Sequence, residues 1–200
     1  MPRIQAASVA EHHARQRRAL LDAARALLAE TGQAPSMAAV GRHAGLARTS
    51  VYQYFASAEE LLAAVVADVF PAWAGRVLAR VAAEPTAASR VWAYVVANVE
   101  LFAGPEQAVA RALTRAVEPR LLQGPIEQFH AQLQGPLRQA LTDLGEPEPE
   151  IMAKLIDSLI VRACQEVGST PRTQATEVAG DTLARLRRLL GPYLGLSPQV

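Results

Sequence analysis

The sequence predicts an all-α protein, and three features of its composition support this fold class. Half of the 200 residues are hydrophobic and a fifth are charged, the balance of a chain with a packed core. Ala, Leu, Arg and Glu, which favour helices, dominate the sequence. Runs of Val, Ile and Thr that alternate with polar residues, the pattern of a half-buried strand, do not occur.

The first expected helix covers Glu11–Thr31, and residues 1–10 are expected to form a disordered or helical arm. Gly32 follows the last apolar position, as is typical of a helix end, because glycine readily adopts the left-handed conformation needed there. The apolar face recurs at helical spacing and consists of Leu20, Ala24, Leu27 and Leu28.

Two short helices and a capped longer one follow. Ser36 is expected to cap a second helix, which Gly45 ends, and a third helix is expected over Arg48–Tyr54. Ser57 is predicted as the N-cap of a fourth helix, with Glu60 three residues later completing a capping box.

Longer helices separated by proline and glycine make up the remainder. Pro71 is expected to kink or end the fourth helix. Prolines 119, 125 and 136 predict an irregular helical region through residue 144. Further helices are expected over 87–103, 106–117, 148–167 and 174–194.

The two short helices joined through Gly45, with another helix packed behind them, predict a helix-turn-helix. The third helix carries polar side chains at its start, where such a helix meets base edges, while Val51 and Phe55 should turn inward. Arg can pair with guanine, Gln with adenine, and a Thr methyl can touch thymine. The predicted base-reading residues are Arg48, Thr49, Ser50 and Gln53. The predicted backbone contacts, to phosphates or the nearby minor groove, are Arg17, Arg18, Ser36, Tyr52 and Tyr54.

The segments "LLDAARALLAETG" and "SMAAVGRHAGLARTSVYQYFASAEEL" resemble the N-terminal domain of the TetR family of transcriptional regulators. The resemblance covers roughly residues 15–65. At Ala58 the family commonly has a lysine, so one phosphate contact is missing here. The matching marks are Ala23–Ala24, Gly32, Ala44–Gly45–Leu46, Tyr52, Tyr54–Phe55, Ser57 and Glu60–Leu61.

The resemblance implies a DNA-binding domain over 1–56 and a helical effector-binding and dimerisation domain over 57–200. The second domain has no diagnostic motif, and each of its aromatic residues has ordinary core packing as the competing interpretation. The candidate effector-binding residues are Trp73, Trp92, Asn98, Phe102, Phe129, His130 and Met152. The candidate dimer-interface residues are Ile151, Leu155, Leu159, Leu183, Leu186 and Leu190.

Several classes of protein are disfavoured. Cys164 is the only cysteine, so an intrachain disulfide or a thiolate zinc cluster cannot form, and we expect no cofactor and no metal. The four histidines do not converge at metal-ligand spacing, and no phosphate loop or nucleophile elbow occurs, which argues against an enzyme. The longest apolar stretches fall short of a bilayer span and no signal-peptide pattern is present, so we expect a cytoplasmic protein without a membrane partner.

Together these features predict a homodimeric, ligand-responsive transcriptional regulator that binds double-stranded DNA. We expect a repressor of a near-palindromic operator, released by a small apolar or aromatic effector. The alternative is a helical protein–protein interaction module that reuses the fold.

Overall fold

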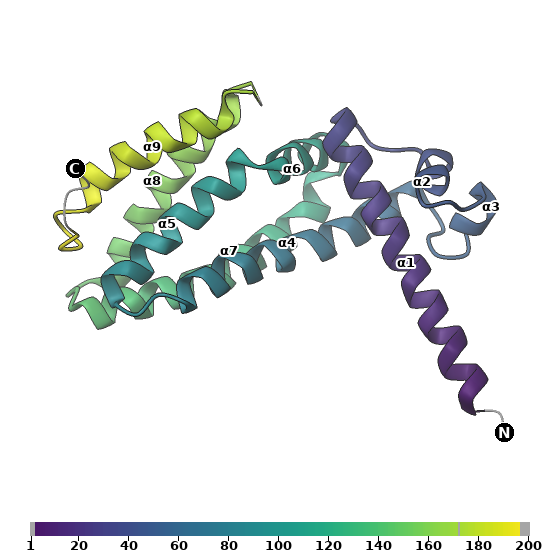
Figure 1. Cartoon of the computed structure of the whole chain (residues 1–200), viewed down its shortest axis with the longest axis horizontal. Helices are drawn as coiled ribbons and strands as arrows, with labels where there is room; N and C mark the ends of the chain where they lie inside the picture. Colours follow the sequence, from purple (N-terminus) through teal and green to yellow (C-terminus); the bar gives the residue numbers. More distant parts are fainter. Residues whose placement is uncertain (1–2, 172, 197–200) are drawn as a thin grey trace. The chain divides into compact units, whose positions relative to one another are not determined.

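The structure is a computed structural model that describes residues 3–171 and 173–196. Over these residues it contains nine α-helices and no strand, so the predicted all-α fold is confirmed (Figure 1). The helices are α1 Arg3–Thr31, α2 Met37–His43, α3 Arg48–Val51, α4 Ala58–Ala82, α5 Ala87–Ala103, α6 Pro105–Ala116, α7 Pro119–Leu144, α8 Pro149–Ser169 and α9 Ala175–Leu190.

The chain divides into two compact units. The N-terminal unit comprises Met1–Val69 and Ala108–Gln123, and the C-terminal unit comprises Phe70–Gln107 and Gly124–Val200, as far as these ranges are described. Each boundary falls within a helix, so α4, α6 and α7 each contribute to both units. The predicted boundary at residue 56 separates a DNA-binding domain from an effector-binding and dimerisation domain. It divides the chain by function, and it stays a prediction.

The N-terminal unit is built by packing α1 on α2 and α2 on α3. Each fully buried Leu, Val or Phe side chain contributes roughly 1.5–3 kcal/mol relative to exposure, so a small set holds these short helices in place. The largest fully buried members of this core include Leu20, Leu28, Val40, Val51, Phe55, Leu61 and Leu113.

In the C-terminal unit α5 packs against both α8 and α9, which also pack against each other. Figure 1 shows these three helices in teal, green and yellow. Helix α5 begins with a capping box, because Thr86 Oγ1 accepts from the backbone N–H of Ser89 and Ser89 Oγ accepts from that of Thr86. Two buried side chains in this unit are Val95 and Ile156.

The prediction of an irregular region over 119–144 is wrong, because α7 is one helix through Pro125 and Pro136. Each proline removes one backbone hydrogen bond, but a buried stripe at helical spacing outweighs that cost. Likewise, Pro71 does not end α4, which continues to Ala82. The α7 stripe consists of Leu122, Phe129, Leu133, Leu137 and Leu141.

Three helix ends differ from expectation by more than two residues. Helix α1 begins at Arg3, so the described part of the expected arm is helical; residues 1 and 2 lie outside the described residues. Helix α3 ends at Val51 instead of Tyr54, because Gln53 and Tyr54 donate to carbonyls three residues back and form tight turns. Helix α9 ends at Leu190, four residues early.

Candidate nucleic-acid interface and ligand sites

The turn between α2 and α3 depends on two glycines. Gly45 has a φ of 72°, in the left-handed region, as predicted. Gly41 is buried, and a Cβ there would lie 2.9 Å from the carbonyl oxygen of Leu46 and 3.0 Å from a methyl of Val51. The need for a glycine at position 41 was not predicted from the sequence. The signal was a glycine inside a short helix, which marks a close approach of backbone segments.

Serine caps fix where α2 and α4 begin. Ser36 Oγ accepts a hydrogen bond of 3.2 Å from the backbone N–H of Ala39, which confirms it as the N-cap of α2. Ser36 is exposed, so its O–H can still donate to a phosphate. Ser57 Oγ accepts from Glu60 N–H at 3.1 Å, but Glu60 Oε2 accepts from Ala56 N–H. The start of α4 therefore has two reciprocal capping bonds. The Glu60 side chain bonds the backbone N–H of Ala56, whereas in a standard capping box it would bond that of the N-cap residue, Ser57.

The outer face of α3 and the turn after it presents polar groups to solvent. Arg48, Thr49 and Gln53 are exposed and Ser50 is half-buried, while Val51 and Phe55 are fully buried as expected. The exposed groups between positions 48 and 53 carry three kinds of hydrogen-bonding chemistry: a guanidinium, a hydroxyl and an amide. Such a surface can read base edges.

Arg48 has a partner on its own helix. Its Nη2 donates to the hydroxyl of Tyr52 at 3.4 Å, and its guanidinium carbon lies 5.8 Å from the centre of the Tyr52 ring. Both side chains are exposed. The contact orients Arg48 along the helix surface before any ligand is bound.

Two other candidate anchors contact aromatic rings. The Tyr54 ring lies 4.5 Å from the His13 ring, at a tilt of 34°, and joins the turn after α3 to α1. Arg17 lies over the buried Phe55 ring at 5.2 Å, while the arginine itself is exposed. The aromatic contacts therefore position both side chains on the unit's surface.

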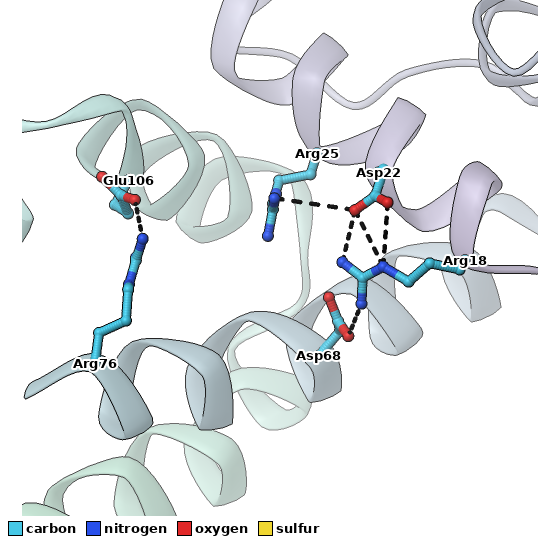
Figure 2. A network of polar contacts seen from close by, with 6 residues as sticks. All are labelled: Arg18, Asp22, Arg25, Asp68, Arg76 and Glu106. Atoms are coloured by element: carbon cyan, nitrogen blue, oxygen red, sulfur yellow. Dashed lines mark hydrogen bonds and ion pairs between the residues drawn. The ribbon is translucent and has the colours of Figure 1, made fainter. Parts of the chain in front are cut away.

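Arg18 lies between two carboxylates. Its Nη2 is 2.6 Å from Asp22 Oδ1, and its Nη1 is 2.5 Å from Asp68 Oδ1 on α4 (Figure 2). The hydrogen bonds to Asp22 and Asp68 raise the pKa of Arg18, and the bond from Arg18 lowers the pKa of Asp22. Arg18 therefore links α1 to the first half of α4, a role that the sequence did not reveal.

The candidate effector residues lie at several places in the C-terminal unit. Trp73 and Phe129 are buried, and Phe70 meets both edge-on, with ring centres 5.3 and 5.8 Å away. His130 is exposed beside Phe129. Asn98 is buried on α5 and donates to the carbonyl of its neighbour Tyr94 at 2.9 Å. Phe102 on α5 and Met152 on α8 are half-buried.

A groove of about 710 Å³ lies between α5 and α9. Trp92 is the one candidate effector residue that lines it, so the seven candidates do not form a single site. Arg187 lies over the Trp92 ring at 5.0 Å. Other lining residues are Val96, Leu183, Arg188 and Leu196.

A polar network joins three helices of the same unit. Asp157 on α8 accepts from the Tyr94 hydroxyl of α5 at 2.9 Å and from Gln134 Nε2 of α7 at 3.0 Å. Burial, followed by the nearby Asp157 charge, raises the pKa of Tyr94 above its ordinary range. These residues stand far apart in sequence, so no local pattern indicated the network.

Cys164 is a buried core residue. Burial raises the pKa of its thiol to about 12, so the thiolate is not available near neutral pH. The side chain therefore packs as a small core residue. Across the described residues, no group of three or more His, Cys, Asp or Glu side chains is placed to hold a metal ion.

The candidate dimer residues separate into two groups. Ile151 and Leu155 are 52% and 55% exposed, and Leu159 and Leu183 are half-buried. Leu186 and Leu190 are buried within the chain itself. A charged substitution at either buried leucine therefore tests the fold before it tests assembly.

Within the described part of the chain, α4 is the one helix long and apolar enough to cross a membrane by length and composition, and 44% of its most apolar window is buried. A core helix of a water-soluble protein has the same properties. The finding is weak support for a membrane span.

Comparison with known proteins adds a family and a fold. Residues 20–65 match the model of the bacterial regulatory proteins of the tetR family. No curated protein matches. Among solved structures, the chain is similar to a TetR-family transcriptional regulator from Pectobacterium atrosepticum, with 23% identity, 90% of this chain and 94% of that one covered, and a TM-score of 0.66.

Two further structures share the fold. AibR in complex with isovaleryl coenzyme A and operator DNA is 18% identical, with 85% and 97% of the two chains covered and a TM-score of 0.61. The superantigen PfiT is 16% identical, with 84% and 94% covered and a TM-score of 0.65.

The motif resemblance is thus confirmed: residues 20–65 are a TetR-type N-terminal domain, and the chain has the fold of TetR-family transcriptional regulators. Proteins of this family are generally not enzymes.

Proposed function

We propose that the protein is a ligand-responsive transcriptional repressor that binds a near-palindromic operator as a homodimer. One observation carries the proposal. Exposed polar side chains, Arg48, Thr49 and Gln53, lie on α3 and the turn after it, while Val51 and Phe55 of the same segment are buried behind them. In this reading Arg17, Ser36, Tyr52 and Tyr54 contact the DNA backbone, and the protein acts in the cytoplasm.

Helix α4 is the proposed route from effector to DNA. Its first half is bonded to α1 through Asp68 and Arg18 within the N-terminal unit. Its second half is paired with α6 through Arg76 and Glu106, at 2.7 Å, within the C-terminal unit (Figure 2). In the same unit it is also paired with α5 through Arg80 and Glu100. A shift of α4 would therefore strain contacts in both units. An effector releases DNA only if it binds the shifted state more tightly.

One solved structure with the same fold supports this proposal. AibR shares the fold and is described with both a coenzyme A thioester and operator DNA. A protein with this fold can therefore bind both a small molecule and operator DNA. For the present chain the effector is proposed to be a small apolar or aromatic molecule, bound in the C-terminal unit.

The dimer is proposed to form through the exposed apolar side chains of α8 and α9. Ile151 and Leu155 lie four residues apart on α8, and Leu189 on α9 is 59% exposed. Burying such side chains against a second copy removes apolar surface from water. Leu159, which is half-buried, would lie at the edge of the same surface, whereas Leu183 lines the groove between α5 and α9.

A protein–protein interaction module is the second candidate. The superantigen PfiT has the same fold, so the fold by itself does not require DNA binding. The distinguishing feature is the outer face of α3, which in an interaction module has no need for groups that read base edges.

DNase footprinting on the DNA that flanks the protein's own gene tests the proposal. We expect protection of a near-palindromic site, lost when Arg48 and Gln53 are both changed to Ala. Failure of the native protein to protect any site, with or without small aromatic or acyl compounds, would favour the interaction module. Sedimentation of the same samples would show whether a dimer exists without DNA.

A further inference from the structure

The groove between α5 and α9 has the properties of a small-molecule site. Its volume of about 710 Å³ falls within the range of roughly 300–1,000 Å³ typical of ligand pockets. Its walls are mainly apolar, with Trp92 and Val96 from α5 and Leu183 from α9. It does not involve the buried rings of Trp73 and Phe129, which pack in another part of the C-terminal unit.

The charges that line the groove are all of one sign. Arg187 and Arg188 contribute positive charge, and no Asp or Glu is among the described residues that line it. Arginines in the last turn of a helix also interact favourably with its carboxyl end, which accounts for their place on α9. The favourable interaction with the helix end does not explain the presence of Trp92. This residue belongs to α5, and its ring stacks under the Arg187 guanidinium at 5.0 Å.

We propose that this groove binds an organic anion with a flat apolar group and a carboxylate. The flat group would lie against Trp92 and Leu183, where it removes apolar surface from water. The carboxylate would meet the exposed guanidinium of Arg188, whose planar set of donors suits a carboxylate. The inference rests on the proposed function only in assigning this anion the role of effector.

A pair of probes that differ in charge alone tests the groove. 2-Naphthoate and 2-naphthamide share a ring system, but only the first is an anion. Calorimetry on the full chain without DNA should show naphthoate binding about tenfold more tightly than naphthamide. In NMR spectra of ¹⁵N-labelled protein, naphthoate should shift the indole N–H signal of Trp92, assigned with Trp92→Phe, and leave that of Trp73 in place.

Substitutions at Gly180 separate a filled groove from a damaged fold. Gly180 lines the groove, and a Cβ built there meets no atom within 4 Å. Gly180→Leu should therefore fill the groove while α9 stays intact, because leucine favours a helix more than glycine does. Binding of both probes should be lost. Gly180→Ala, the matched control, should retain the preference for naphthoate.

Substitutions of arginine test the charge. Arg188→Gln should weaken naphthoate binding about fivefold and leave naphthamide unchanged. Arg111→Gln removes the same charge from an exposed position on α6, in the N-terminal unit, and should change neither affinity.

Equal affinities for the two probes, or a shift of Trp73 in place of Trp92, would overturn the proposal. So would full naphthoate binding by Gly180→Leu. Gel shifts on the flanking DNA are run separately. Loss of anion binding with DNA binding intact rejects the groove alone, whereas absence of DNA binding with the anion site intact rejects the regulator.

Discussion

The two units place their polar side chains in opposite ways. In the N-terminal unit the polar groups around α3 come from one short segment and face solvent, with Val51 and Phe55 behind them. In the C-terminal unit the polar groups of Tyr94, Gln134 and Asp157 come from three helices and meet in or near the interior. A surface that reads a partner can be altered without loss of the fold, whereas an interior network is part of what holds the fold together.

The largest expected effect comes from a charge placed in the C-terminal core. Leu186→Glu buries a carboxylate where 7% of the side chain is exposed, and should cost about 4 kcal/mol or more, enough to unfold this unit. Thermal denaturation followed by circular dichroism measures the loss.

Leu189→Glu is the matched control, because this neighbouring leucine is 59% exposed. It should keep the melting temperature of the isolated chain and weaken the proposed dimer, which light scattering detects. If both variants lower the melting temperature equally, the assignment of Leu186 to the core and Leu189 to the surface of α9 is wrong.

The next effect concerns the reading surface. Arg48→Ala should lower affinity for the cognate site by about tenfold or more and relax preference at one base position, because a bidentate contact to guanine is lost. The fold should be unaffected, since Arg48 is exposed. Titrations on the operator, single-base variants and random DNA provide the measurement.

Tyr52→Phe sharpens that test. It removes the hydroxyl that Arg48 contacts at 3.4 Å and keeps the ring. We expect a smaller loss of DNA affinity than for Arg48→Ala, and a similar loss on every DNA sequence. Equal losses on operator and random DNA for Arg48→Ala would make Arg48 a phosphate anchor.

A smaller effect on stability is expected from the interior network. Asp157→Asn leaves Tyr94 or Gln134 with a poorer acceptor and should cost roughly 1–3 kcal/mol in denaturant unfolding. Ser158→Ala, at the next and exposed position, should stay within about 0.5 kcal/mol of the native chain. If Asp157→Asn leaves the free energy of unfolding unchanged, the network does not stabilise this unit.

The smallest effect is expected at Arg18, which is half-exposed. Its ion pairs with Asp22 and Asp68 are worth about 0–1 kcal/mol each in solvent. In the folded protein the pKa of Asp22 is lowered from its ordinary value of 3.8. The Asp22 carboxylate therefore contributes its full stabilisation above pH 3.8, and this stabilisation is lost as the pH falls through the lower folded-state pKa. Asp22→Asn should therefore flatten the acid end of the stability profile slightly.

DNA binding decides between two roles for Arg18. If it contacts a phosphate, Arg18→Gln should reduce the salt slope by about one, and Asp68→Asn should strengthen binding by freeing the guanidinium. If Arg18 only links α1 to α4, neither variant should change affinity for random DNA. Measurements at several salt concentrations separate the two.

Features that depend on neighbouring residues could be predicted from the amino-acid sequence. The left-handed glycine at Gly45, the cap at Ser36 and the inward turn of Val51 and Phe55 all follow from local backbone chemistry and helical periodicity. The family motif lies in the same segment, so the all-α fold and the N-terminal domain could be predicted.

Features that join distant residues became visible when the helices were packed together in the fold. The continuation of α7 through Pro125 and Pro136 depends on buried contacts that outweigh two lost backbone bonds. The partners of Arg18 and Asp157 lie on other helices, and Trp92 and Arg187 meet across 95 positions of chain. Long-range contacts of this kind leave no local pattern, because packing selects them only after the helices have formed.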